Sequence, residues 1–173
     1  MLRLAFLLAI GVFVLAACGS GNDSTATPGS SPTPSVHAPC GSETPAPAFD
    51  NAPTLTFGAS SQALRVETAS TAEEQHLGLM NRTCLGDDWG MIFVYTTDVS
   101  DTFWMKNTFV PLTVAFVASD GTILALINMQ PQTEELHASP SPYRWAIEAN
   151  EGWYTAHGIR VGDRVSIPPL LLS

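Results

Sequence analysis

Apolar and polar residues alternate, or apolar residues run together, in short segments from about residue 53 to the end of the chain. Alternation with a period of two is typical of strands with one buried face, and a short continuous apolar run is typical of a buried strand. Turn residues separate the segments; Ser119-Asp120-Gly121, for example, predicts a tight hairpin turn. The predicted strands cover residues 54–57, 63–68, 91–95, 112–118, 122–129, 144–149 and 165–167.

Two short helices are predicted between the strands. Ser70 and Glu73 have the spacing of a capping box, which would begin a helix that runs to about Leu79. A second helical turn is expected over residues 152–157, with Gly158 at its end. Short strands combined with one or two short helices indicate a mainly β fold, either a compact sandwich or a partly open barrel.

The N-terminus has a different pattern. Arg3 precedes an apolar run over residues 5–17, which is shorter than the roughly 20 residues that a membrane-spanning helix needs. The segment Leu15-Ala-Ala-Cys18 then resembles the lipobox of bacterial lipoproteins. This resemblance implies a lipoprotein signal peptide over residues 1–17, cleavage before Cys18 and lipidation of Cys18. We therefore expect an extracytoplasmic protein that this cysteine anchors to the cell membrane; an uncleaved transmembrane anchor is the alternative.

Residues 18–52 are rich in Pro, Ser, Thr and Gly and show no apolar periodicity. A segment of this composition buries too little apolar surface to offset the entropy of ordering it, so we expect a disordered tether. A single β domain would then cover residues 53–173, which is a usual size for one domain.

The chain of 173 residues is acidic, with a formal net charge of −9 from 7 basic and 16 acidic residues. The basic residues are scattered and form no stripe that could follow a phosphate backbone. This distribution disfavours nucleic acid as a partner. No cofactor is predicted.

Several motifs occur in an order and at spacings that point to one family. They are Gly78-Leu-Met-Asn-Arg82, Gly90-Met-Ile-Phe93, Phe103-Trp-Met-Lys-Asn-Thr108, Pro111-Leu112, Glu148 and Gly158-Ile-Arg-Val-Gly-Asp163. Over about residues 64–167 the chain resembles the family called domain of unknown function 192. The resemblance implies a compact, jelly-roll-like β domain that is often exported, and it implies no established activity.

The chain departs from that family pattern at two places. Family members usually carry Asp where this chain has Thr113, so this chain lacks one charge if that acid takes part in a site. Many relatives also carry two cysteines in the loop before the last long strand, whereas residues 130–143 contain none.

Two cysteines, Cys40 and Cys84, remain after lipidation of Cys18. An even pair in an oxidising compartment suggests a disulfide. It would join the tether to the domain by closing a loop of about 45 residues, worth roughly 2–4 kcal/mol. The alternative is two unpaired cysteines.

Methionine and histidine side chains could suggest a copper site, because thioethers and imidazoles suit that metal. They have no close spacing along the chain, and methionines in buried strands are usually core filler, so no metal site is predicted. The residues concerned are Met80, Met91, Met105, Met129, His76, His137 and His157.

A lysine lies inside the aromatic segment 103–108, and two interpretations of it stay open. A single strand here would place Phe103, Met105 and Asn107 on one face and Trp104, Lys106 and Thr108 on the other. Lys106 would then lie beside an indole in a partly buried pocket, with Glu148 as its preferred counter-charge. Alternatively, Lys106 extends over Trp104 to water and forms a surface ion pair.

The leading hypothesis is a binding or accessory module for a small polar or anionic ligand, or for another envelope protein. The residues expected at its pocket are Arg82, Trp104, Lys106, Asn107, Thr108, Glu148 and Asp163. An enzyme is the first alternative, a hydrolase or transferase that uses Lys106 and Glu148 on an envelope substrate. The second is a structural envelope protein without a pocket. Asp163, which follows Gly162, also suits a plain turn.

Overall fold

The structure of the chain is a computed structural model, and it describes residues 52–58 and 62–172. The predicted signal peptide, Cys18, Cys40 and most of the tether lie outside these residues. Over the part of the chain that is described, no helix is long and apolar enough to cross a membrane.

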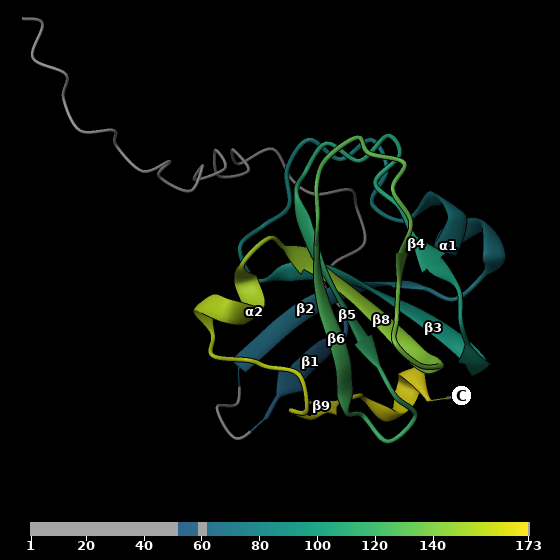
Figure 1. Cartoon of the computed structure of the whole chain (residues 1–173). Coiled ribbons are helices and arrows are strands. Elements are labelled where there is room, and N and C mark those ends of the chain that lie inside the picture. Colours follow the sequence, from purple (N-terminus) through teal and green to yellow (C-terminus); the bar gives the residue numbers. More distant parts are fainter. Residues whose placement is uncertain (1–51, 59–61, 173) are drawn as a thin grey trace, which may run out of the picture. The chain divides into compact units, whose positions relative to one another are not determined.

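Strands make up most of the regular secondary structure of the described chain, which also contains two short α-helices and one 3-10 turn (Figure 1). The elements are β1 Thr54–Phe57, β2 Gln62–Ala69, α1 Ala72–Leu77, β3 Trp89–Val99, β4 Thr102–Phe103, β5 Leu112–Val117, β6 Ile123–Met129, β7 His137–Ala138, β8 Tyr143–Asn150, α2 Trp153–Ala156, β9 Val165–Ser166 and η1 Pro169–Leu171.

Seven of the described strands form one sheet in the order β6-β5-β8-β3-β2-β1-β9, and β4 pairs with β7 in a separate two-stranded ribbon. Neighbouring strands in the sheet are antiparallel except β2 and β3, which are parallel. A parallel pair needs a crossover connection, and the segment that contains α1 provides it. Strand β8 lies in the interior of the sheet, between β5 and β3.

Alternation along the strands gives the sheet two apolar faces. In β8, Ile147 belongs to a core that also contains Phe57, Trp153 and Tyr154; we call this the α2-side core. The adjacent Ala146 belongs to a second core with Phe93, Phe103 and Phe116, which we call the β4-side core. Because successive side chains of a strand point to opposite faces, each core covers one face of the sheet.

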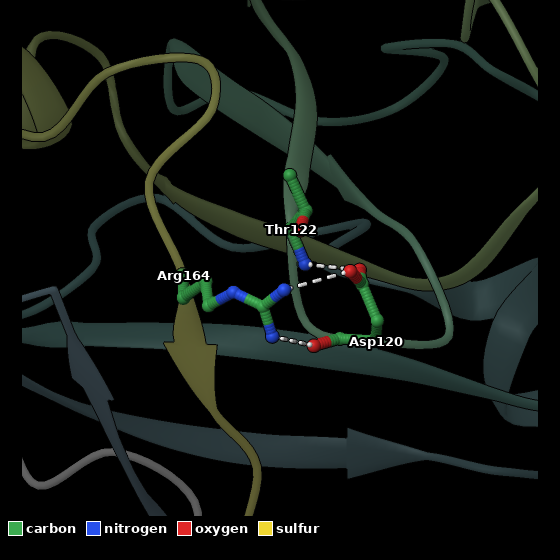
Figure 2. Close-up of polar contacts among 3 residues, drawn as sticks. All are labelled: Asp120, Thr122 and Arg164. Atoms are coloured by element: carbon green, nitrogen blue, oxygen red, sulfur yellow. Dashed lines mark hydrogen bonds and ion pairs between the residues drawn. The ribbon is translucent and has the colours of Figure 1, made fainter.

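The two edges of the sheet meet next to the hairpin between β5 and β6. Thr122, just before β6, forms an isolated antiparallel bridge with Arg164, just before β9. Figure 2 shows the side chains at this seam: the Arg164 guanidinium pairs with Asp120 Oδ2 at 3.0 Å and donates to the Asp120 carbonyl at 3.0 Å. The Thr122 backbone N–H donates to Asp120 Oδ1 at 2.9 Å and holds the pKa of Asp120 below its usual range. The sheet is therefore curled into a partly open barrel.

The observed fold confirms the predicted mainly β class, and each predicted strand is present with bounds that differ by a few residues. The capping box predicted at the start of α1 is displaced by one residue. Thr71, not Ser70, is the N-cap of α1, and the reciprocal bonds are made with Glu74, not Glu73. The backbone N–H of Ser70 also donates to the Glu74 carboxylate, at 2.8 Å.

The single strand considered for residues 103–108 does not form beyond Phe103, where β4 ends. The chain turns at Lys106 and Asn107, and Asn107 has a φ of 55°. Asparagine tolerates this left-handed conformation better than most residues, and one such residue ends the alternation of a strand. Phe103 and Met105 are buried together as expected, but Asn107 is exposed and Thr108 is buried.

Candidate functional site

A cleft of about 450 Å³ opens on the β4-side face of the sheet. Its walls come from α1 with the turn after it, from β3, and from the segment around β4; α1 and β4 lie side by side (Figure 1). The lining residues are Ala72, Gln75, His76, Leu77, Gly78, Leu79, Met80, Phe93, Tyr95, Asp101, Thr102, Phe103, Trp104, Thr108, Leu136 and Glu148. This volume falls in the range of small-molecule sites.

Glu148 is the buried acid of this cleft. In the sheet it lies between Met91 of β3 and Val114 of β5, both members of the β4-side core. Only 4 % of the residue is exposed. Burial raises the pKa of its carboxyl to about 8. Among the described residues, no hydrogen-bond donor or cation satisfies this carboxyl, so the site holds a buried acid that is open to a ligand.

The backbone of Glu148 is held by a close approach of β3. A Cβ atom on Gly90 would collide with the Glu148 carbonyl oxygen, so only glycine fits at this point of the sheet. The glycine that opens the Gly90-Met-Ile-Phe93 motif therefore has a structural reason: it lets β3 lie against the strand that carries the acid.

Aromatic side chains form much of the cleft wall. Phe93 and Phe103 meet edge to face with ring centroids 4.8 Å apart and are largely buried. Tyr95 is half-buried, and its pKa is raised mainly by burial, with the nearby charges of Asp101 and Glu148 adding to the rise. Trp104, also half-buried, completes the wall. An aromatic wall next to a buried carboxyl can hold a group that is both apolar and positively polarised.

Exposed side chains surround the mouth of the cleft. Leu77 and Leu136 line it although they are 53 % and 62 % exposed, respectively. The ring of His76, exposed on α1, lies 6.4 Å from the Trp104 ring. Asp101 adds a second carboxylate, and the hydroxyl of Tyr143 donates to its backbone carbonyl at 3.1 Å.

Of the seven residues predicted at the pocket, the structure brings three to the cleft: Trp104, Thr108 and Glu148. Lys106 is next to it but does not line it. Its ammonium lies 5.1 Å from the centroid of the Trp104 ring and 3.5 Å from Glu134 Oε1. The expected pairing of Lys106 with Glu148 is therefore wrong. The structure shows the alternative interpretation instead: Lys106, whose side chain is 44 % exposed, lies near the Trp104 ring and forms a surface ion pair.

The other three residues lie elsewhere. Arg82 makes a close ion pair with Glu67, with Nη2 2.6 Å from Oε2. The Asn107 carbonyl accepts a bond from the Asn81 backbone at 2.8 Å. Asp163 accepts one from the Arg160 backbone at 2.8 Å and acts as a turn residue, the simpler of the two interpretations.

Thr113, the departure from the family pattern, lies on the opposite side of the sheet from the acid. It is paired in register with Ala149, a member of the α2-side core, whereas its neighbour Val114 is paired with Glu148. The Thr113 hydroxyl donates to Asn128 Oδ1 at 2.8 Å and accepts from the Gly152 backbone at 3.3 Å. The missing charge therefore leaves the cleft unchanged.

Cys84 is disulfide-bonded, and its partner lies outside the described residues. The pairing with Cys40 stays a prediction. Among residues 52–58 and 62–172, no group of three or more His, Cys, Asp and Glu side chains is arranged to hold a metal ion.

Sequence reasoning missed most of the cleft wall. Phe93 and Tyr95 share a face with Met91 in β3, and Met91 pairs with Glu148, so the period of two could have placed these aromatic residues near the acid once the strand pairing was known. Asp101, His76 and Leu136 carry no local signal, because they reach the cleft from three separate connections.

Fold and cleft together define a curled, partly open β domain with a ligand-sized cleft on one face of its sheet. A family model described as uncharacterized ACR, that of domain of unknown function 192, matches residues 54–167, and the chain belongs to this family.

The solved structures that are similar to the chain include two crystal structures of bacterial proteins. One is a protein of unknown function from Novosphingobium aromaticivorans, 38 % identical, with a TM-score of 0.63 over 66 % of this chain and 84 % of that one. The other, from Sinorhizobium meliloti, is described as a candidate transcription regulator; it is 34 % identical, with a TM-score of 0.62 over 65 % of this chain and 91 % of that one. No curated protein matches the chain.

Proposed function

We propose that this protein is a binding module, displayed outside the cytoplasmic membrane on a lipid anchor, whose cleft takes a small ligand at Glu148. The observation that carries the proposal is the acid itself. Glu148 as a residue is 4 % exposed and lines a cleft of about 450 Å³, and its carboxyl has no partner among the described residues, so its burial costs folding free energy. A ligand that pairs with the carboxyl would offset that cost. An apolar residue at this position would not carry the cost at all, so the acid indicates a functional role.

The cleft favours binding over the two alternatives. A structural protein without a pocket has no use for a cleft of this volume with an acid inside it. The enzyme alternative relied on Lys106 next to Glu148, but Lys106 pairs with Glu134 instead. A proton held by Glu148 near neutral pH would suit a general acid. Among the described lining residues, however, there is no lysine, cysteine or serine, and the hydroxyl of Thr108 donates to the Lys106 carbonyl at 3.4 Å, not to a base that would activate it.

The test is native mass spectrometry of the full chain, purified from membranes, for a co-purifying small molecule. We expect a bound species in the wild type and its loss in Glu148→Gln, which keeps the size of the side chain. Lys106→Ala is the matched control, since it alters a neighbour that does not line the cleft, and it should keep the bound species. An equal amount of bound species in the wild type and in Glu148→Gln would contradict a binding site at Glu148.

The anchor rests on the lipobox-like segment and the tether that follows it. Two or more acyl chains hold a protein stably at a membrane, whereas one does so only marginally. Growth with labelled palmitate should label the wild type and leave Cys18→Ala unlabelled. Equal labelling of the two forms would refute the anchor.

A further inference from the structure

We infer that the ligand of this cleft is an organic ammonium cation, held between the Glu148 carboxylate and the aromatic wall, with apolar substituents that reach the mouth. The inference rests on the proposed binding function and specifies the chemical class of its ligand.

The charges that line the cleft exclude an anion as the preferred ligand. Two carboxyl groups, Glu148 and Asp101, line it, and none of the lining residues is Lys or Arg. The one lining base, His76, is exposed on α1 at the mouth. Among the lining residues an anion would meet two acids and no Lys or Arg, whereas a cation would meet two acids; Lys106 lies outside the lining and pairs with Glu134. This reverses the anionic part of the expectation drawn from the sequence.

The wall offers the aromatic surface that ammonium groups prefer. Phe93, Tyr95, Phe103 and Trp104 line the same cleft as the acid. A cation near the face of such a ring is attracted by its quadrupole, most strongly for tryptophan. The chain itself gives an example: the Lys106 ammonium lies 5.1 Å from the centroid of the Trp104 ring, at the edge of this site.

The mouth of the cleft indicates what the ammonium carries. Leu77 and Leu136 are more than half exposed and line the cleft from α1 and from the segment before β7. Apolar side chains in these positions would lose contact with water when a ligand's hydrocarbon part lies between them. An alkylammonium or arylalkylammonium compound meets both requirements, the charge at depth and the apolar part outside.

Binding of such a cation should depend on pH. Glu148 has to release its proton to pair with the ligand, so affinity rises as pH rises toward its pKa of about 8 and then levels off. For this pKa the dissociation constant should be about 50-fold higher at pH 6 than at pH 8. The other titratable groups that line the cleft are Tyr95, Asp101 and His76.

The test uses the full chain with choline as the probe and 3,3-dimethyl-1-butanol as its uncharged isostere, each titrated at pH 6 and pH 8 and followed by NMR shifts of the cleft residues. We expect choline to bind at least tenfold more tightly than the isostere at pH 8. Glu148→Gln should weaken choline binding at least tenfold, while Glu134→Gln, which removes a carboxylate outside the cleft, should change it less than twofold.

The outcomes separate the inference from the proposed function. Equal binding of choline and its isostere, or choline binding that Glu148→Gln leaves unchanged, would overturn the ammonium assignment. If in that case native mass spectrometry still found a species lost in Glu148→Gln, the binding module would stand with a different ligand class. Absence of both choline binding and a co-purifying species would refute both.

Discussion

The two faces of strand β8 bury apolar side chains alike but treat polar groups differently. On the α2-side, the Tyr154 hydroxyl donates to the Ile147 carbonyl at 2.9 Å, and Trp153 Nε1 donates to Asp88 Oδ1 at 3.0 Å. Trp145 Nε1 is an exception there, with no partner among the described residues. On the β4-side, the Glu148 carboxyl has no partner in the described chain either, and it is an ionisable group that lines a cleft.

This difference separates the α2-side face, which stabilises the fold, from the β4-side face, which carries the candidate binding site. Buried polar groups in a structural core are normally hydrogen-bonded, because an unsatisfied group costs about 1–3 kcal/mol. An indole N–H without a partner is a modest cost. An acid whose pKa burial raises to about 8 is a larger cost, and this acid lines a cleft in which a ligand could offset it.

The largest expected effect is the pH dependence of stability due to Glu148. Its folded-state pKa of about 8 lies above the usual 4.5, so between these values the folded chain keeps a proton that the unfolded chain has lost. Stability is therefore fully present below pH 4.5 and is lost as pH rises toward 8, by up to about 5 kcal/mol. Urea unfolding of the wild type and Glu148→Gln across this pH range should show this loss of stability in the wild type alone. If the free energies of unfolding of the two proteins changed in parallel with pH, Glu148 would not be the unpaired acid that distinguishes the β4-side face from the α2-side face.

The next effect is a truncation in the α2-side core. Phe57 is fully buried and meets both Trp153 and Tyr154 edge to face. Phe57→Ala should lower the free energy of unfolding by about 3–5 kcal/mol, because it removes apolar contact and leaves a cavity. Denaturant unfolding at one pH measures it, and a loss below 1 kcal/mol would show that this face is not the main source of stability.

A smaller effect is expected where a satisfied polar group is removed. Tyr154→Phe deletes the hydroxyl that donates to the Ile147 carbonyl and should cost about 1 kcal/mol. The same unfolding experiment tests it. A gain in stability would mean that the bond on this face is not favourable and that the two faces treat polar groups alike.

The smallest effect is expected at Lys106. Its pairing with Glu134 is between half-exposed and exposed side chains, and its contact with Trp104 is at the edge of the cleft. Lys106→Ala should change the free energy of unfolding by less than about 1 kcal/mol. A loss of several kcal/mol would restore Lys106 to the centre of the site and contradict its placement outside the cleft.

Local pattern predicted the strands well, because each needs only its own alternation of apolar and polar residues. It also singled out Glu148, whose apolar neighbours Ile147 and Ala149 place it in a strand. The pairing of Glu148 with Met91 joins residues far apart in the chain, and no spacing within one strand reveals it. Lys106 was misplaced because β4 ends at Phe103 and the chain turns at Lys106 and Asn107, so the longer strand that the neighbouring residues suggested does not form.

The cleft wall was the least predictable part. Its residues come from α1, β3, β8 and the connections around β4 and β7, and the curl of the sheet brings them together. That curl is fixed partly by the seam between Thr122 and Arg164, which are 42 residues apart (164 − 122). Contacts at such separations depend on the whole fold.

The most direct test of the account is an NMR titration of the Glu148 side-chain carboxyl carbon in ¹³C-labelled full chain, assigned by comparison with Glu148→Gln. We predict a midpoint near pH 8, with the carboxyl protonated at neutral pH because burial raises its pKa. A midpoint near 4.5 would show a solvated or already paired carboxylate, and it would contradict the claim that this face of the sheet holds an acid for a ligand.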